Sequence, residues 1–599
     1  TPNPVSMHDI YDKSEQSGYY MNFSLDVDII KNMLSAKVLY GLNKENTSRD
    51  SYIPSDVYYA LQRKSRGNLG YGKRQQSTLE GTLTFQHKFG ELLDMNLMAG
   101  MGRYLDSGDG SDISYENAND HIQGSSVGMA DGPFYPTSYK FKIEKRSEFG
   151  RGNFVLLGRY VVSASLRRDG TDKFFPSKKY ALFPSVSLAW KMNEESFIKN
   201  ISWINMLKLR ASYGETGSDN LGTTLYGIVT TTREDVQFNN NSVTYIPYIL
   251  SGANYEDVTW QKTVMKNIGL DFSVLRDRIW GSVDIFRNDV THLLGTAPTE
   301  LLGMHGTRPI NGGHYKRTGV DVSLNSLNLQ THDFKWTSQI TMSHYNAVWI
   351  ERMPNYDYQK YQKRKNEPMN AFYYYKTTGI INVDKSNMPE SQRSLGPAAC
   401  MPGYPIVEDK NGDGIIDVND SYMDNTLPKL YFGFGNTFTW KNFDLDIFMY
   451  GQLGVKKWND AYGNSIDVGG LSRGVDAHNV GIYSYNIWNT QTSTNGRFPG
   501  IAISKSEALP ENLGFDYTRE NASYIRVRNI TLGYNLGPKE LSVFKGYIRG
   551  IRVFVDFQNP LTLTKYKGYD PEINTSSSNL TGGQYPQMRV YSIGAKLTF

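Results

Sequence analysis

The chain has 599 residues and a net charge of +4, with 64 basic and 60 acidic residues distributed along its length. This balance leaves no basic face, so nucleic-acid binding is not expected. The mean hydropathy is negative and no apolar run of about 18 residues occurs, which excludes helical membrane spans. The single cysteine, Cys400, excludes a disulfide framework and a thiolate metal site.

Apolar and polar residues alternate along most of the chain. The stretch 21–29 alternates, a tight turn follows at 30–33, and the alternation resumes at 34–40. Because successive side chains of a strand point to opposite faces, this period of two predicts β-strands. The unit of strand, turn and returning strand recurs further along the chain, at 268–285, 320–336 and 438–449. The polar partners include charged residues such as Asp271, Asp284 and Asp321, so one face is expected to meet water.

The lengths of the strands and connections separate two all-β architectures. The alternating stretches run about ten to fifteen residues, which suits a strand crossing a bilayer better than the strands of a soluble sandwich. Short turns alternate with long loops, which is the outer-membrane pattern. We therefore predict an all-β, transmembrane antiparallel β-barrel of roughly 16 to 18 strands in one domain, residues 1–599. The long extracellular loops are expected at about 106–138, 217–258, 348–427 and 454–520.

Several motifs, in a fixed order, resemble the SusC/RagA family of TonB-dependent outer-membrane transporters of Bacteroidetes. They include "SASLRRDGTDKF" at 163–174, "LKLRASYGETGSDNLG" at 207–222, "NASYIRVRNITLGYNL" at 521–536 and "VFVDFQNPLTLTKYKGYDPEI" at 553–573. The last residues, 591–599, alternate and end on Phe599, which resembles the terminal strand of an outer-membrane barrel. The resemblance covers the chain from about residue 140 to its end.

The resemblance implies a fold and a function. It implies the C-terminal part of a barrel of about 22 strands, with the plug domain and the first strands not recognisable in this chain. A plug and barrel portion of the same protein is therefore expected to accompany it. TonB is expected as a partner that acts through that portion. A SusD-like surface lipoprotein would form a lid, and a dimer of SusC–SusD pairs is a further expectation. The implied function is TonB-dependent nutrient uptake of oligosaccharides or oligopeptides at the outer membrane of a Gram-negative bacterium, in contact with outer-membrane lipid.

Other functions remain as alternatives. One is a passive porin or structural barrel, and another is a siderophore or vitamin receptor of the same barrel type. No metalloprotease, nucleophile-elbow, P-loop or complete dinucleotide motif occurs, so we expect no enzyme and name no catalytic residue.

Four consecutive aromatic residues in a long loop are candidate substrate contacts. Phe372, Tyr373, Tyr374 and Tyr375 have the flat faces that stack on sugar rings or pack against peptide side chains. The alternative for each is packing within the loop or contact with the lid.

The stretch "DKNGDGIIDVND" at 409–420 has the ligand spacing of an EF-hand loop, with Gly414 at the sixth place. No amphipathic helix flanks it, so the prediction is a coordination site without the EF-hand fold. Asp420 replaces the usual Glu at the twelfth place and is one methylene shorter. The predicted ligands of a structural calcium ion are Asp409, Asn411, Asp413, Ile415 through its carbonyl, Asp417 and Asp420. The alternative is that Asn-Gly and Asp-Gly merely form turns. We favour calcium, because turn chemistry alone does not require four acidic residues at ligand spacing.

Overall fold

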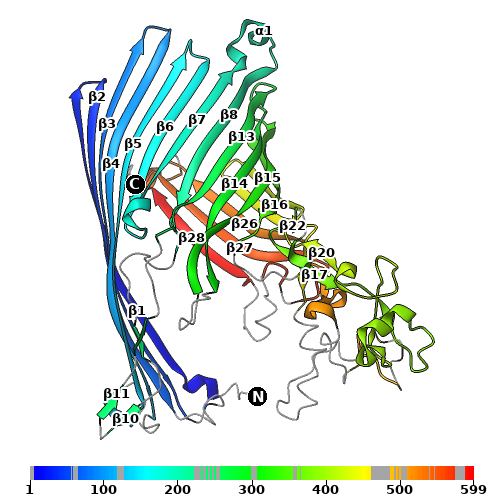
Figure 1. Ribbon diagram of the computed structural model, residues 1–599. Coiled ribbons are helices and arrows are strands. Elements are labelled where there is room, and N and C mark those ends of the chain that lie inside the picture. Colours follow the sequence, from blue (N-terminus) through cyan, green and yellow to red (C-terminus); the bar gives the residue numbers. More distant parts are fainter. Residues whose placement is uncertain are drawn as a thin grey trace.

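The computed structural model describes residues 6–55, 57, 65–117, 127–221, 231–233, 238–240, 243–245, 248–250, 256–298, 307–354, 360–363, 366–459, 486–490, 494, 496, 498–500, 509–538, 540–544, 547–568, 570–573 and 587–598. These residues form a sheet of 17 strands, each antiparallel to the next one along the sheet (Figure 1). The number of strands confirms the predicted barrel wall. The strands are β1 (Tyr11–Ile30), β2 (Leu34–Ile53), β3 (Arg66–Phe89), β4 (Leu93–Glu116), β5 (Phe134–Leu156), β6 (Tyr160–Thr171), β7 (Tyr180–Lys191), β8 (Ile204–Ser218), β13 (Gln261–Val274), β14 (Ile279–Pro298), β15 (Thr307–Gln330), β16 (Phe334–Glu351), β21 (Leu430–Trp440), β22 (Phe443–Leu453), β26 (Tyr524–Leu536), β27 (Gly550–Thr564) and β28 (Val590–Thr598).

The two ends of the sheet differ in their connections. At one end, which we call the turn end, most strands are joined by two to four residues, as between β1 and β2 or between β21 and β22. The short helix α1 (Ser196–Lys199) also lies at this end, between β7 and β8. At the other end, the loop end, long segments follow β8, β16 and β22. Because consecutive strands are antiparallel, this division follows directly from the meander.

One predicted loop is much shorter than expected. The sequence predicted a loop at about 106–138, but β4 continues to Glu116 and β5 begins at Phe134. The strands here have 24 and 23 residues and are fully paired over that length. The prediction was wrong because the apolar alternation stops before the strand does. Backbone hydrogen bonds hold the ladder together even where both faces are polar.

One face of the sheet is an exposed apolar band. Residues paired directly across neighbouring strands share a face, and Phe23, Tyr40 and Leu79 form such a row. Ile268 and Ile285 form another, and they are 61% and 63% exposed. A sheet that exposes this much apolar surface on one face matches the lipid-facing side of a membrane barrel. We call this the outer face.

The opposite face is polar and carries ion pairs that join strands. Arg210 on β8 donates to Asp271 on β13 at 2.7 and 2.9 Å and to Asp284 on β14 at 3.1 Å. Arg552 pairs in the same way with Asp444, from β27 to β22. The predicted wet face is therefore confirmed, and we call it the lumen face.

The sheet has two edges. Among the described residues, β1 pairs only with β2 and β28 only with β27, so neither pairs with the other. Every residue of β1 is exposed. A row of unpaired backbone N–H and C=O groups is strongly unfavourable in lipid, because hydrocarbon offers no hydrogen-bond partner.

Smaller elements lie in the loops. The loop after β8 holds two antiparallel strand pairs, β9 (Thr231–Arg233) with β12 (Tyr248–Leu250) and, between them in the chain, β10 (Phe238–Asn240) with β11 (Val243–Tyr245). The loop after β16 holds β17 (Ala371–Tyr375), β18 (Thr377–Ile380), β19 (Pro405–Val407) and β20 (Tyr422–Asn425), with the 3-10 helices η7 (Glu390–Leu395), η8 (Pro397–Cys400) and η9 (Val418–Asp420). The loop after β22 holds β23 (Lys456–Trp458), β24 (Gly514–Phe515) and β25 (Arg519–Asn521). None of the helices in the described residues is long and apolar enough to cross a membrane.

Candidate functional site

The long loops after β16 and β22 pack together into one folded body. Strand β17 pairs antiparallel with β20 and parallel with β24, which joins the two loops. Between them lies a hydrophobic core that includes Tyr375, Tyr404 and Phe515, each at most 3% exposed. We call the described parts of 360–429 and 509–521 the loop unit. It lies at the loop end of the sheet, at the right of Figure 1.

The four predicted aromatic contacts lie inside this unit. Tyr373 and Tyr374 are each 8% exposed and Tyr375 is fully buried, while Phe372 is half-buried. The guanidinium of Arg519 lies 4.2 Å from the ring centroid of Phe372, and Tyr374 stacks on Tyr422 at 5.9 Å. Burial raises the pKa of Tyr374 to about 12, so its hydroxyl stays neutral. These contacts favour packing within the loop, and a role in binding substrate stays a prediction.

The acidic loop 409–420 folds around its own backbone. Asp409 accepts hydrogen bonds from the N–H groups of Gly412 and Gly414 at 2.8 and 2.9 Å. Asp413 accepts from the N–H of Ile415 and from the side-chain amide of Asn411, both at 2.8 Å. Gly412 and Gly414 have φ values of +73° and +84°, in the left-handed region where glycine is favoured. The turn chemistry predicted as the alternative is thus present.

Asp420 has a different position from the other predicted ligands. It is fully buried and accepts from the N–H groups of Lys410, Asn411 and Asp417. Asp417 and Asp420 also form a capping box on η9. Both carboxylate oxygens of Asp420 therefore bind backbone N–H groups of the loop itself. The hydroxyl of Tyr375 donates to the carbonyl of Asp417 at 3.0 Å, which ties the acidic loop to the aromatic strand β17.

These contacts define how well the loop suits a cation. Asn411 and Asp413 are exposed and hydrogen-bond to each other, whereas Asp409 is half-buried and accepts from the N–H of Gly412; we call these three residues the rim. Each carboxylate has about four lone-pair positions, and the hydrogen bonds described use about half of them. Across the described residues, no group of three or more His, Cys, Asp or Glu side chains is arranged to hold a metal. The rim therefore retains oxygens for an ion, whereas Asp420 is committed to the backbone.

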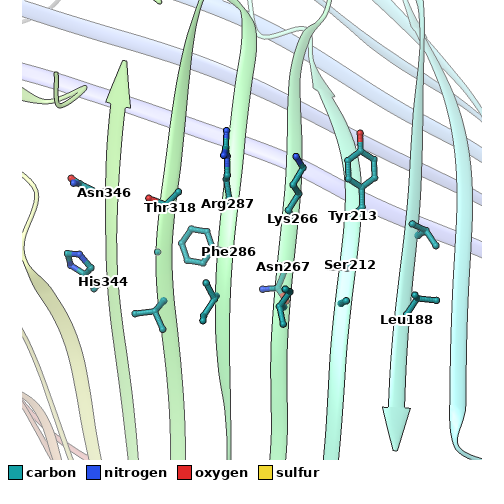
Figure 2. Close-up of a pocket in the computed structure, with 16 residues that line it drawn as sticks. Leu188, Ser212, Tyr213, Lys266, Asn267, Phe286, Arg287, Thr318, His344 and Asn346 are labelled. Atoms are coloured by element: carbon teal, nitrogen blue, oxygen red, sulfur yellow. The ribbon is translucent and has the colours of Figure 1, made fainter. Parts of the chain in front are cut away.

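A groove of about 810 Å³ lies on the outer face, across β7, β8, β13, β14, β15 and β16. Figure 2 shows Tyr213, Lys266, Arg287, Thr318 and Asn346 side by side along it. Because this groove faces away from the lumen, it is not part of a transport path.

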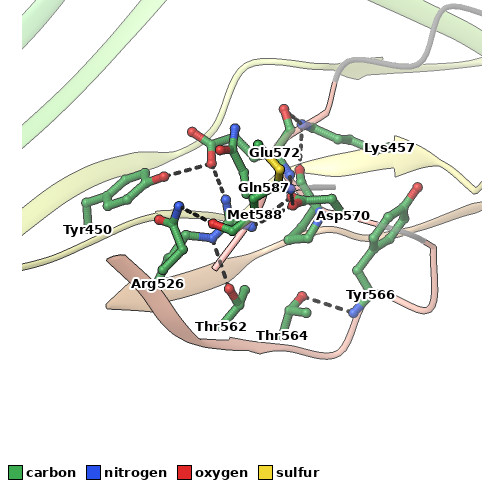
Figure 3. Close-up of polar contacts among 12 residues, drawn as sticks. Tyr450, Lys457, Arg526, Thr562, Thr564, Tyr566, Asp570, Glu572, Gln587 and Met588 are labelled. Atoms are coloured by element: carbon green, nitrogen blue, oxygen red, sulfur yellow. Dashed lines mark hydrogen bonds and ion pairs between the residues drawn. The ribbon is translucent and has the colours of Figure 1, made fainter. Parts of the chain in front are cut away.

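A buried ion cluster, which the sequence analysis missed, joins β26 to the segment after β27 (Figure 3). The Arg526 side chain, 2% exposed, binds both carboxylate oxygens of Asp570 at 2.8 and 2.9 Å and one oxygen of Glu572 at 2.6 Å. Its Nε donates to the hydroxyl of Thr562 at 2.9 Å, and Tyr450 donates to Glu572 at 2.7 Å. We call Arg526, Asp570 and Glu572 the anchor cluster.

The anchor cluster explains two motifs noted in the sequence. Arg526 belongs to "YIRVRN" and the two acids to "GYDPE". An arginine on a strand and an acidic pair in a loop were visible as a signal, but nothing in the sequence shows that they meet. Burial acts to raise the pKa of Asp570, but the N–H groups of Glu572 and Gln587 and the Arg526 guanidinium outweigh this and hold it below its ordinary value.

An apolar outer face, a polar lumen face and long loops at one end together define the wall of a transmembrane β-barrel. The family model described as "TonB dependent receptor-like, beta-barrel" matches residues 2–559, and the chain belongs to this family. It is thus an outer-membrane barrel chain, as the sequence predicted.

Individual relatives support a narrower grouping. TonB-dependent receptor P3 of Formosa agariphila is 26% identical over 98% of this chain and 58% of its own length. TonB-dependent receptor SusC of Bacteroides thetaiotaomicron is 28% identical over 77% of this chain and 44% of its own. The structure of the RagAB peptide transporter matches 100% of this chain and 63% of its own, with a TM-score of 0.80 and 21% identity, which shows a shared fold. The predicted SusC/RagA resemblance is confirmed, and the chain spans less than two thirds of each of these proteins.

Proposed function

We propose that this chain is the barrel wall of a TonB-dependent importer that carries nutrients through the outer membrane. The observation that supports this most directly is the pairing of a charged lumen face with a large folded loop unit at the loop end. A lumen lined by ion pairs such as Arg210 with Asp271 keeps a polar path through lipid. The family to which the chain belongs consists of transporters, and we expect no enzymatic activity from it.

The cargo that we propose is an oligopeptide or an oligosaccharide. RagAB is described as a peptide transporter, and SusC as a TonB-dependent receptor. We propose that a SusD-like lipoprotein covers the loop end, since the loop unit offers a folded surface with its own core on which a lid can rest. A pairwise dimer of such complexes is part of the same proposal, and the mass of the complex extracted from membranes tests it.

We also propose that further strands of the same protein pair with β1 and β28. Two exposed edges are not stable in lipid, and closing the barrel satisfies their backbone groups. The plug that a TonB-dependent importer needs would belong to the same additional portion. Hydrogen exchange tests the closure, because the β1 amides are protected in a closed barrel and unprotected at an open edge.

Uptake measurements test the function itself. Cells that carry or lack the protein are supplied with labelled oligopeptide and oligosaccharide pools, with and without TonB. We expect uptake of one pool to require both the protein and TonB, and to stop when the proton gradient is dissipated. Uptake that continues without TonB would identify a passive porin, and uptake restricted to ferric siderophores or a vitamin would identify the other alternative.

We further propose a structural calcium ion in the loop 409–420. The supporting feature is the rim of Asp409, Asn411 and Asp413, to which the carbonyl of Ile415 and the side chain of Asp417 would add ligands. Bound calcium would stiffen the loop unit where the lid rests. Calcium titration calorimetry on wild type and on Asp409→Asn with Asp413→Asn tests this, with Asp384→Asn as control. Asp384 is an exposed aspartate in the same loop, and its carboxylate accepts hydrogen bonds from the N–H and the hydroxyl of Ser386. Equal binding by all three proteins would exclude the site.

A further inference from the structure

The groove on the outer face consists of two adjacent rows of side chains that differ in polarity. Each row is a set of directly paired residues, one per strand. The row nearer the loop end is Val186, Tyr213, Lys266, Arg287, Thr318 and Asn346. The row nearer the turn end is Leu188, Ala211, Ile268, Ile285, Val320 and His344. The groove therefore crosses a boundary from a polar row to a mainly apolar one (Figure 2).

The charges in the polar row and just beyond it, toward the loop end, are not all balanced. Arg287 donates to both oxygens of Asp289 at 2.8 and 2.9 Å, so its charge is compensated. Lys262 is likewise paired with Glu215 at 2.6 Å. Lys266 lies beside Arg287 and Lys316 lies beside Asp289. Neither lysine forms a hydrogen bond or ion pair with any other described residue.

An unpaired lysine on a lipid-facing surface has a definite physical requirement. In hydrocarbon an ammonium group is costly, so a lysine on this face lies where its head reaches the headgroup layer. Lys266 lies in the polar row, and Lys316 follows Thr318 at the next position of the same face of β15, beyond the groove toward the loop end. Both lysines therefore lie on the loop side of the boundary, in the leaflet on that side. Basic pockets at this depth favour anionic headgroups, and the apolar row below suits an acyl chain.

We propose that this groove binds an acylated lipid with an anionic phosphate headgroup. Lys266 and Lys316 hold the phosphate, Tyr213 and Thr318 border it, and an acyl chain lies along Ile268, Ile285 and Val320. The apolar hollow has room for a chain because Ala211 interrupts the row of larger residues. The site depends on the position of the sheet in the membrane and is independent of the cargo.

Lipid competition in nanodiscs tests this proposal. The protein, isolated from outer membranes, is placed in nanodiscs of equal parts phosphatidylglycerol and phosphatidylcholine, and the lipids that stay bound are counted by native mass spectrometry. A lysine near an anionic lipid surface contributes about a fivefold preference, so two lysines give about 25-fold. We expect that enrichment of phosphatidylglycerol in the wild type, about fivefold in Lys266→Gln, and none in Lys266→Gln with Lys316→Gln.

Control variants make the result specific. The pair Lys266→Arg with Lys316→Arg keeps the charges and should keep the enrichment, which also shows that the groove is folded. Lys335→Gln removes a lysine from the lumen face, on the same row as Asp444, and should leave the enrichment unchanged. Heat-modified migration on gels confirms that each barrel is folded.

Five outcomes would overturn the proposal. Four are a wild type without enrichment, a double Gln variant that keeps it, a Lys335→Gln variant that loses it, and full competition by millimolar inorganic phosphate, which would mean an anion site without a lipid. The fifth is a second protein cross-linked at Lys266 in place of lipid.

Discussion

Removing the arginine of the anchor cluster should release the segment that follows β27. In Arg526→Met, Asp570 loses two hydrogen bonds and its counter-charge while it remains only 4% exposed at its side chain. Breaking a buried ion pair from one side costs about 3–5 kcal/mol, because a charge is left buried without a partner. The bonds to Glu572 and Thr562 are lost as well. We therefore expect the segment to detach from β26 while the barrel stays folded.

Amide hydrogen exchange measures this detachment at two defined positions. The N–H groups of Glu572 and Gln587 donate to Asp570 at 2.8 and 3.0 Å. A loss of 3–5 kcal/mol corresponds to exchange about 150- to 5,000-fold faster, up to the rate of an unfolded segment. The double variant Arg526→Met with Asp570→Asn should exchange more slowly than Arg526→Met, because the unpaired charge is removed.

A neighbouring arginine provides the matched control. Arg528 lies two residues further along β26, is exposed, and forms no ion pair among the described residues, although its guanidinium lies 5.9 Å from the Tyr450 ring. Arg528→Met should leave both amides unchanged. Wild-type exchange at Glu572 and Gln587 in Arg526→Met, or equal acceleration in Arg528→Met, would show that Arg526 does not hold this segment.

Three further predictions concern the sheet, the loop unit and acid stability. Ile285→Arg places a charge on the outer face, one row inside the polar boundary, and should cost about 1–2 kcal/mol, between the interfacial and mid-membrane costs, whereas Ser282→Arg, on the lumen face, should cost little. Urea titrations of folding into vesicles compare the two variants, and equal costs would contradict the assigned faces. Tyr375→Phe removes the hydrogen bond from a fully buried ring to Asp417 and should lower the stability of the loop unit by about 1 kcal/mol. Proteolysis within 371–425 should become faster, and an unchanged rate of cleavage would contradict this prediction. The pKa of Asp570 lies below its usual value of about 3.9, so the stability that its carboxylate gives to the segment is complete at neutral pH and is lost as pH falls through the lowered pKa. Protection of the Glu572 amide, corrected for intrinsic exchange, should therefore fall only below about pH 4. A loss of protection near pH 6 would contradict this prediction.

Strand pairing was predictable because it depends on a local pattern. Met21, Phe23 and Leu25 alternate with polar residues, and any strand with that pattern must place them on one face. The turns after β1 and β21 follow from the short breaks between alternating stretches. The loop at 106–138 was overestimated because strands β4 and β5 continue into water, where side-chain polarity no longer distinguishes strand from loop.

The loop unit was less predictable, because its residues meet only after the chain has folded. The aromatic run 372–375 has the same composition whether it lines a binding surface or fills a core. Its burial depends on β24, which lies about 140 residues further along the chain. The acidic spacing at 409–420 was visible, but the capture of Asp420 by three backbone N–H groups was not.

The sequence by itself determined the class of the protein, since period-two alternation, short turns and family motifs are all local features. Only the tertiary structure decided which charged groups compensate one another. Arg526 and Arg528 look equivalent in the sequence, yet one is buried against Asp570 and the other faces solvent. Likewise Lys262 and Lys266 are four residues apart on β13, and Glu215 on β8 is paired with Val264 midway between them, yet only Lys262 forms an ion pair with Glu215, at 2.6 Å. Electrostatic partners are set by distance in space, which cross-strand register controls and residue order does not reveal.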